Sequence, residues 1–334
     1  MRYESSITSL SWIPSEAVTG ASRLPFDKGI AHYDEPPPAE LDDVEELQAA
    51  DRFRFANVHR AWIEVGDDGE ITDAGYGGGG LIGSTMVRLA GLRYRFQAVK
   101  LPDIQRPPES GPGWVRFVQT VGGRTGVPMP RPVKHPPYVQ WLAPLVWSTL
   151  TLTLHADGSV EQAMTGASAF PRHWVYGADS CLSHKSGLTD YAGWSSTSFG
   201  KHSPWGDEDS PALVTAVETA LERALSVQLM HGAAKPVVSR PSAGSTVVHQ
   251  GEPGTSVFLV LDGVIRVEHD GEPLAEYGPG AMLGERAHLE GGNRTSSLVA
   301  VTDCRVASAE ASQFDHDALV ELSGGHRRED AGRG

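Results

Sequence analysis

The chain has 334 residues, 40% of them hydrophobic and 21% charged, so it can form two ordinary domains and is neither disordered nor fibrous. Lys and Arg number 28 against 42 Asp and Glu, and the formal charge of -14 argues against a general affinity for nucleic acid or anionic lipid. The two cysteines, Cys181 and Cys304, lie far apart without metal-ligand spacing, which favours neither a disulfide framework nor a zinc site.

Targeting signals are not evident in the sequence. The first twenty residues have no basic start, no continuous apolar stretch and no cleavage pattern of a secretory signal. No run of about twenty apolar residues occurs, so no membrane span is expected. We therefore expect a cytoplasmic protein that does not bind a membrane.

Residues 1–209 are predicted to form an antiparallel, β-rich domain of unknown function. Residues 39–50 are acidic and predict a short helix. Alternating apolar residues predict strands at 52–65, 86–100, 114–121 and 148–155, with hairpin turns at 67–69 and 157–158. The proline-rich stretches 102–112 and 127–137 are predicted to be loops or linkers, because proline cannot donate to a sheet ladder.

Two features of this domain suggest chemistry but lack the context for it. Gly75–Gly80 satisfies GxGxxG, yet no helix and distant acidic residue follow it, so a flexible loop is the better interpretation. Residues 170–191 gather a His, a Lys and an Asp (His173, Lys185 and Asp190) with aromatic residues; such groups could supply an acid, a base and a nucleophile, but nothing fixes their geometry. The thirteen histidines show no HxH or HExxH, and no metal is expected. A non-enzymatic role is favoured, and an enzyme or small-molecule site within residues 52–200 is the alternative.

A linking helix is predicted at residues 210–231. Leu213, Val217, Leu221 and Leu225 recur every four residues, and Ser210 is suited to cap the first turn. Asp207, Glu208 and Asp209 precede it and are expected to be solvated at its positive end.

Residues 232–323 are predicted to form a compact β-roll. Short apolar runs alternate here with glycines at turn-like intervals, which is typical of a jelly-roll module. Within it lie a GEPG turn at 251–254, a GPG at 278–280, and Gly-Glu at 284–285 followed by Arg294.

These motifs resemble the cyclic-nucleotide-binding domain, the ligand domain shared by the cyclic AMP receptor protein and the regulatory subunit of protein kinase A. The resemblance covers about residues 237–312, and the ordered glycines together with the cassette at 284–294 make it specific. It implies that cyclic AMP or cyclic GMP is the regulatory ligand. Cyclic AMP is favoured because it is a prevalent bacterial ligand.

The resemblance also implies the roles of single residues. Arg294 corresponds to the arginine that grips the cyclic phosphate, and Glu285 to the carboxylate that accepts from the ribose 2′-hydroxyl. Arg286 and His288 are less usual in this family. Three roles stay open for them: they could face solvent, add positive field near the phosphate, or touch a partner. The expected nucleotide-binding residues are Gly284, Glu285, Arg286, Ala287, Arg294, Thr295 and Ser296.

Little chain follows the cassette. Residues 314–322 predict a helix of about two turns that ends at Gly324 and Gly325, leaving a flexible tail at 324–334. No helix-turn-helix fits, so direct DNA binding is not expected. The sequence thus predicts a regulatory protein that couples a cyclic nucleotide to its N-terminal domain, to a protein partner or to self-association. A scaffold with a degenerate nucleotide module is a further alternative.

Overall fold

The computed structural model describes residues 1–89, 91–132, 134, 136–199, 203–206, 210–232 and 235–331. Its internal contacts divide the chain into two compact units: an N-terminal unit, Met1–Ser183 with Thr189–Ala212, and a C-terminal unit, His184–Leu188 with Leu213–Gly334. Strands predominate in both, so the predicted mainly β (α+β) fold is confirmed. None of the described helices is long and apolar enough to cross a membrane. Asp207, Glu208 and Asp209, expected at a helix start, lie outside the described residues.

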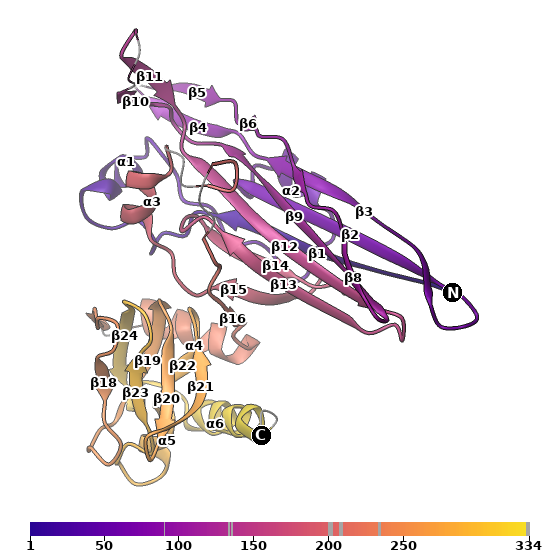
Figure 1. Ribbon diagram of the computed structural model, residues 1–334. Coiled ribbons are helices and arrows are strands. Elements are labelled where there is room, and N and C mark those ends of the chain that lie inside the picture. Colours follow the sequence, from indigo (N-terminus) through magenta and orange to yellow (C-terminus); the bar gives the residue numbers. More distant parts are fainter. Residues whose placement is uncertain are drawn as a thin grey trace. The chain divides into compact units, whose positions relative to one another are not determined.

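Two large antiparallel sheets and two two-stranded ones make up the N-terminal unit (Figure 1). The first has the order β14-β1-β2-β3, with bounds β1 (Arg2–Trp12), β2 (Phe55–Val65), β3 (Ile71–Ile82) and β14 (Arg172–Tyr176). The second has the order β13-β12-β9-β6, with β7 and β8 also paired to β9. Its bounds are β6 (Val99–Lys100), β7 (Ile104–Gln105), β8 (Glu109–Gly111), β9 (Trp114–Arg124), β12 (Leu145–His155) and β13 (Val160–Ala167). The short helices are η1 (Gly20–Arg23), α1 (Leu24–Asp27), α2 (Val44–Ala49) and α3 (Tyr191–Thr197).

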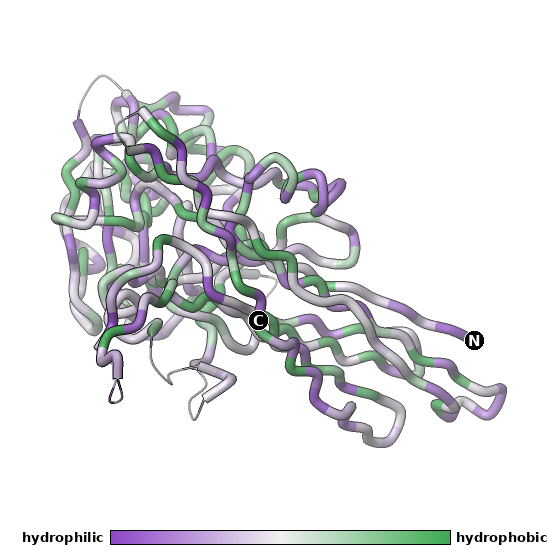
Figure 2. The backbone as a smooth tube through the Cα atoms, turned by 90° about the horizontal axis from the view of Figure 1, so that it is seen from above, coloured by the Kyte–Doolittle hydropathy of each residue, from purple (hydrophilic) through white to green (hydrophobic). Residues whose placement is uncertain are grey.

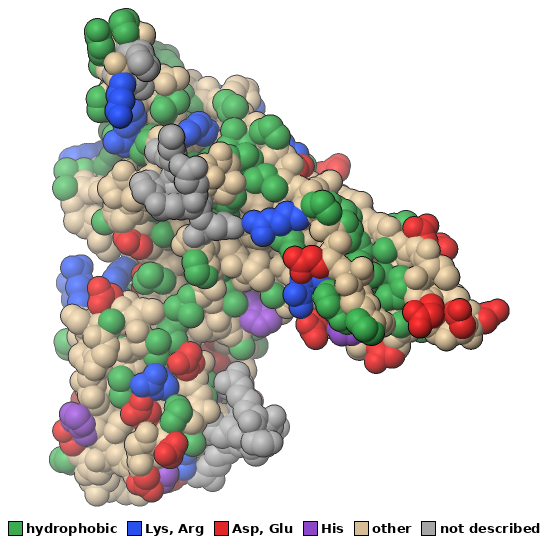
Figure 3. Space-filling view, viewed as in Figure 1, with side chains coloured by type: hydrophobic (Ala, Val, Ile, Leu, Met, Phe, Trp, Pro, Cys, Tyr) green, Lys and Arg blue, Asp and Glu red, His purple; other side chains and the backbone are tan. Residues whose placement is uncertain are grey.

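Burial alternates along much of β2 because successive side chains point to opposite faces, whereas β12 is buried almost throughout. Leu150, Leu152 and Leu154 of β12 are fully buried, and Figure 2 shows hydropathy changing sign along these strands. A polar network also joins the two sheets: the Gln119 amide donates to Asn57 Oδ1 at 2.9 Å, and the Asn57 amide donates to the Ser148 carbonyl at 3.0 Å. Acidic side chains gather at the far end of the long strands in Figure 3.

Three of the predicted strands and both hairpin turns are confirmed as β2, β9, β12 and the turns after β2 and β12. The strand predicted at 86–100 is wrong, because this stretch forms a separate hairpin, β4 (Thr85–Leu89) with β5 (Leu92–Phe96), before β6. The proline-rich stretches are not wholly loops either. They hold β7, β8 and β10 (Met129–Pro132), which pairs with β11 (Val139–Leu142). Prolines are tolerated here because these strands are short and peripheral.

Residues 75–80 lie inside β3, so the loop predicted there is wrong. A Cβ atom at Gly75 would lie 2.7 Å from the Trp62 ring on the neighbouring strand β2. Glycine in β3 therefore leaves room for a large side chain of the neighbouring strand, and the GxGxxG match is unrelated to phosphate binding.

The C-terminal unit is a β-roll with helices on one side (Figure 1). Its two sheets have the orders β17-β24-β19-β22 and β18-β23-β20-β21. The bounds are β17 (Val237–Ser239), β18 (Thr246–Val248), β19 (Ser256–Asp262), β20 (Ile265–His269), β21 (Glu272–Tyr277), β22 (Met282–Leu283), β23 (Ser297–Ala300) and β24 (Arg305–Glu310). The helices are α4 (Ala220–His231), α5 (Glu285–Leu289), η2 (Ala311–Gln313) and α6 (His316–Ala331). The hairpin of β15 (Leu182–Ser186) with β16 (Val214–Ala216) joins this unit through residues 184–186.

Strand β19 divides the core of this unit in two. Val257, Leu259 and Leu261 pack towards α4 and α6, whereas Phe258 and Val260 point into the interior of the roll. This alternation follows from the twofold period of a strand, and it lets one sheet hold the roll together while also anchoring both helices.

Both predicted helices of this unit differ from the observed ones. The helix predicted from Ser210 begins only at Ala220, because Thr219 and Glu222 form a capping box there and β16 occupies residues 214–216. The helix predicted at 314–322 begins at His316 and continues through Gly324 and Gly325 to Ala331. Glycine costs about 1 kcal/mol in a helix interior. The burial of Leu319 and Leu322 against Leu225 and Leu229 of α4 offsets this cost.

Candidate functional site

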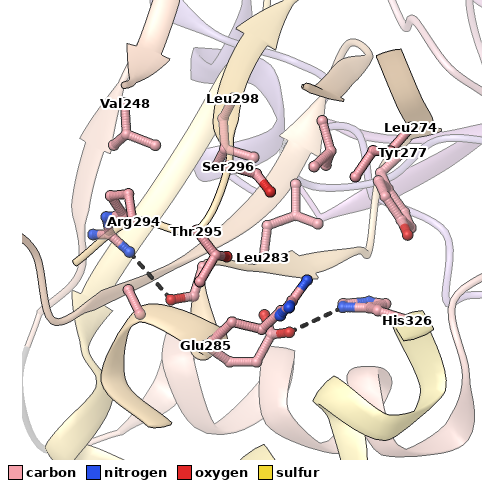
Figure 4. A pocket seen from close by; sticks show the side chains of 14 residues that line it. Val248, Leu274, Tyr277, Leu283, Glu285, Arg294, Thr295, Ser296, Leu298 and His326 are labelled. Atoms are coloured by element: carbon pink, nitrogen blue, oxygen red, sulfur yellow. Dashed lines mark hydrogen bonds and ion pairs between the residues drawn. The ribbon is translucent and has the colours of Figure 1, made fainter. Parts of the chain in front are cut away.

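A single pocket of the C-terminal unit gathers the residues of the predicted cassette (Figure 4). The loop from β22 into α5, the segment from Arg294 to β23, strands β18, β20 and β21, and helix α6 all contribute side chains. The lining residues are Val248, Val267, Leu274, Tyr277, Leu283, Gly284, Glu285, Arg286, Ala287, Arg294, Thr295, Ser296, Leu298 and His326. All seven residues expected from the sequence are therefore brought together in space.

The backbone around Gly284 and Gly254 holds Arg294 in place. Gly284 has a φ of 90°, and a Cβ there would lie 2.9 Å from the Arg294 guanidinium. The GEPG turn pairs with the cassette through Gly251 N to Arg294 O and Arg294 N to Glu252 O, both 2.8 Å. Local turn chemistry thus delivers the arginine to the pocket.

Arg294 is a buried cation, only 6% exposed. Its guanidinium donates to the carbonyls of Ser256 at 2.8 Å and Gly284 at 3.1 Å, and it lies 5.0 Å from the Phe258 ring centre. Its buried Nε has no hydrogen-bond partner in the structure. Burial lowers the pKa of this guanidinium, while the charges of Glu310 and Glu252 oppose the shift. A buried, incompletely bonded guanidinium is suited to an anion.

Glu285, the first residue of α5, is 2% exposed and contacts the C-terminal helix. His326 of α6 places Nδ1 3.2 Å from Glu285 Oε1, as Figure 4 shows, and Nε2 3.5 Å from Glu222 Oε1. Burial alone would lower the pKa of His326, but its contacts with both carboxylates raise it to about 10. His326 is therefore an imidazolium between two carboxylates at neutral pH.

Glu222 comes from the first turn of α4 and is also buried. It accepts from the amides of Thr219 at 2.8 Å and Met282 at 3.2 Å. Burial would raise its pKa, yet His326 and these two amides together hold it below its usual value. Glu222 is thus ionised, and it connects α4, β22 and α6 at one point.

The remaining wall of the pocket is apolar or hydroxylated. Val248, Leu274, Tyr277 and Leu298 face the cavity from the strands, and Figure 4 shows the Ser296 hydroxyl among them. Arg286 lines the rim and pairs with Glu290 at 3.3 Å on its own helix. A charged end and an apolar end therefore meet in one small pocket, which is the usual composition of a small-molecule site.

Sequence reasoning missed Glu222, Tyr277 and His326. Tyr277 directly precedes the GPG turn, and this position next to a family motif is a signal that could have indicated its place in the pocket. His326 continues the spacing of Leu319 and Leu322 along one helix face, but the two glycines predicted that the helix had already ended. The helix predicted at 210–231 puts Glu222 in its middle. The spacing of Glu222 from Thr219 is that of a capping box, which marks the start of a helix.

The acid and base candidates of the N-terminal half each have a structural partner. His173 Nδ1 lies 2.6 Å from the Ser11 hydroxyl, and its Nε2 donates to the Ser168 carbonyl at 2.8 Å. Lys185 forms an ion pair with Glu218, and Asp190 caps α3 by accepting from Gly193 N. These groups thus contribute to folding contacts. Among the described residues, no group of three or more His, Cys, Asp or Glu is arranged to hold a metal ion.

Comparison with known proteins identifies the C-terminal segment. Residues 240–316 match the family model described as cyclic nucleotide-binding domain. Over 75 residues the chain is 36% identical to the cGMP-dependent protein kinase egl-4 of Caenorhabditis briggsae, covering 22% of this chain and 10% of the kinase. Over 81 residues it is 35% identical to the CRP-like cAMP-activated global transcriptional regulator of Mycobacterium tuberculosis, covering 23% of this chain and 34% of the regulator.

Among solved structures, a cyclic nucleotide-binding domain from Methylobacillus flagellatus aligns at 22% identity with a TM-score of 0.27, covering 29% of this chain and 64% of that one. The alignments to the kinase and the regulator span only a minor part of either protein. Residues 240–316 of this chain form a cyclic nucleotide-binding domain.

Proposed function

We propose that the C-terminal unit binds a cyclic nucleotide, with cyclic AMP as the favoured ligand, and that this binding regulates the N-terminal unit or a protein partner. The observation that carries the proposal is the state of Arg294. It is a buried guanidinium that donates to two carbonyls, and its buried Nε has no hydrogen-bond partner. A cyclic phosphodiester would supply the missing anionic acceptor.

The rest of the pocket fits the other parts of the ligand. Glu285, as a carboxylate, can accept from the ribose 2′-hydroxyl. Gly284 and Ala287 allow the sugar phosphate to approach the backbone closely. The hydroxyls of Thr295 and Ser296 follow Arg294 and are placed to contact phosphate or purine. Arg286 adds positive charge at the rim.

The apolar wall is suited to the base. Val248, Leu274 and Tyr277 present a surface on which a purine can pack. Both adenine and guanine have such a face, so discrimination between cyclic AMP and cyclic GMP depends on polar contacts at the base edge. Thr295 is the residue we expect to decide it.

The output is proposed to be regulation through protein contacts. The net charge of -14 opposes direct DNA binding, and no membrane interaction is proposed. A ligand can transmit a signal only if it binds two states of the coupled unit with different affinity. Because all eight tryptophans precede residue 206, a change in tryptophan emission on nucleotide addition would report on residues outside the binding domain.

Calorimetric titration of the whole chain with cyclic AMP and cyclic GMP tests the binding. Arg294→Ala should weaken it by tens-fold or more, since losing a contact to a buried charge costs roughly 2 to 5 kcal/mol. Arg266→Ala removes an arginine of the same roll, one paired with Glu268, and serves as the matched control. Absence of binding to either nucleotide would instead favour the scaffold hypothesis.

A second binding function is favoured by one observation in the N-terminal unit. A cavity of ≈ 390 Å³ is lined mainly by apolar side chains, among them Phe26, Met86, Phe170 and Trp194. Apolar clefts of this size commonly hold small molecules. Quenching of tryptophan emission by a small apolar dye, lost in Phe170→Ala, would support a ligand there.

A further inference from the structure

Helix α6 reaches the nucleotide pocket along its buried face. Leu319 and Leu322 pack in the core with Leu225 and Leu229 of α4, and His326 follows on the same face about one turn further. The first half of α6 is therefore anchored by apolar burial, while His326 leaves this core and lies against Glu285. Its place in the pocket depends on the helix continuing past Gly324 and Gly325.

The pocket is small when His326 lies in it. The cavity between its walls measures ≈ 60 Å³, which is the volume of about two water molecules in the liquid. Sites for drug-sized ligands measure about 300–1,000 Å³, so no nucleotide fits without movement of a wall. Glu285 is 2% exposed, and thus the carboxylate proposed for the ribose is itself covered.

Among the labelled side chains of Figure 4, His326 is the one contributed by α6. The roll strands are joined by backbone hydrogen bonds, whereas His326 is held by side-chain contacts with two carboxylates and with the Tyr277 ring. Charge-assisted contacts of this kind contribute favourably but can be exchanged for another charged or polar partner. The end of α6 is thus the part of the pocket wall that can move most easily.

We infer that His326 is a self-inhibitory latch: it occupies Glu285 in the free protein, and a cyclic nucleotide must displace it to bind. The inference rests on the proposed nucleotide site. Displacement of His326 also removes the contact with Glu222 at the start of α4, so the latch couples ligand binding to two helices of the C-terminal unit. Regulation requires that the nucleotide bind two states of the protein with different affinity. The two states here differ in the partner of Glu285, which is His326 in the free protein and the ribose hydroxyl in the complex.

The latch makes a definite prediction for His326→Gln in the full-length chain. Glutamine keeps a polar side chain but removes the positive charge, so the closed state loses its contacts with two carboxylates. Hydrogen bonds to charged groups contribute about 1.5–3 kcal/mol, so the affinity for cyclic AMP should rise about tenfold or more by calorimetry. His316→Gln is the matched control, because His316 is an exposed residue of the same helix. It should leave the affinity unchanged.

Hydrogen exchange without nucleotide provides a readout that does not depend on binding. In His326→Gln the amides of the second half of α6 should exchange faster than in the wild type, and those of His316→Gln should not. An unchanged or weakened affinity in His326→Gln, with a binding-competent wild type, would overturn the latch while leaving the nucleotide site intact. If neither protein binds cyclic AMP or cyclic GMP, the proposed function itself fails. Binding by His326→Gln alone would support both.

Discussion

Gly254 lies against the guanidinium of Arg294: a Cβ atom at this position would sit 2.7 Å from Arg294 Nε and 2.7 Å from one terminal nitrogen. Forty residues separate the two in sequence, and the bond from Gly254 N to the Gly292 carbonyl, 2.8 Å, brings them together. The glycine of the GEPG turn is therefore needed for the placement of the arginine as well as for the turn.

Gly254→Ala should consequently weaken nucleotide binding without unfolding the domain. The added methyl group must push the guanidinium aside, and overpacking of this kind costs typically about 1–3 kcal/mol. We expect a loss of about tenfold in affinity by calorimetric titration. Gly77→Ala, where the methyl group meets nothing within 4 Å, is the control and should bind as the wild type does. Equal affinities for the two variants would contradict the role given to Gly254.

The stability of the C-terminal unit should fall at alkaline pH. The folded pKa of His326 is about 10 against an ordinary value of 6.5, so its contribution is fully present below pH 6.5 and is lost as pH rises through 10. Glu222 of α4 and Glu285 of α5 are the charged groups that face it, and Tyr277 of β21 packs against its ring at 5.3 Å.

Urea unfolding followed by circular dichroism between pH 6.5 and 10 measures this dependence. The free energy of unfolding of the wild type should fall by on the order of a few kcal/mol from pH 6.5 to 10, whereas that of His326→Gln should fall much less. Parallel curves for the two proteins would show that His326 is not held as an imidazolium.

The N-terminal unit should show the opposite dependence. Burial of the ring inside the sheets lowers the pKa of His173 to about 4, although its hydrogen bond to the Ser168 carbonyl opposes this shift. Its stabilisation is therefore present above pH 6.5 and is lost as pH falls through 4. Tryptophan emission reports on this unit alone, and its urea midpoint should decrease from pH 7 to pH 4. An NMR titration that finds the His173 ring protonated at pH 5.5 would refute the assignment.

The buried ion pair of Lys185 with Glu218 should hold residues 184–188 to the C-terminal unit. Both side chains are nearly inaccessible, at 5% and 7% exposure. Lys185→Met leaves Glu218 buried with Arg223 as its remaining cation at 3.6 Å, and breaking such a pair costs about 3–5 kcal/mol. Combining it with Glu218→Leu should recover most of the loss. Lys28→Met, at an exposed position, is the control. If Lys28→Met and Lys185→Met have similar urea unfolding midpoints, the ion pair does not stabilise the unit as predicted.

Local patterns predicted much of the fold and most of the site. The alternation in residues 148–155 predicted a strand, since a strand buries every second side chain. The resemblance of residues 284–294 to the cassette of the cyclic-nucleotide-binding domain implied that these residues lie together in one pocket. Patterns failed where one stretch holds several elements, as between residues 86 and 100, and where glycines serve close packing, as in β3.

The sequence by itself predicted the β-roll and its turns, because short apolar runs between turn glycines are typical of such a module, and its resemblance to the cyclic-nucleotide-binding domain implied the seven residues of the pocket. Tertiary structure alone decided that His326 and Glu222 meet at Glu285 and that Lys185 finds Glu218. These charges come from helices and strands distant in sequence, and their pairing depends on how the apolar faces of α4 and α6 pack on the roll. The same packing carries α6 through two glycines that local propensity marks as its end, since buried leucines offset the cost of the glycines.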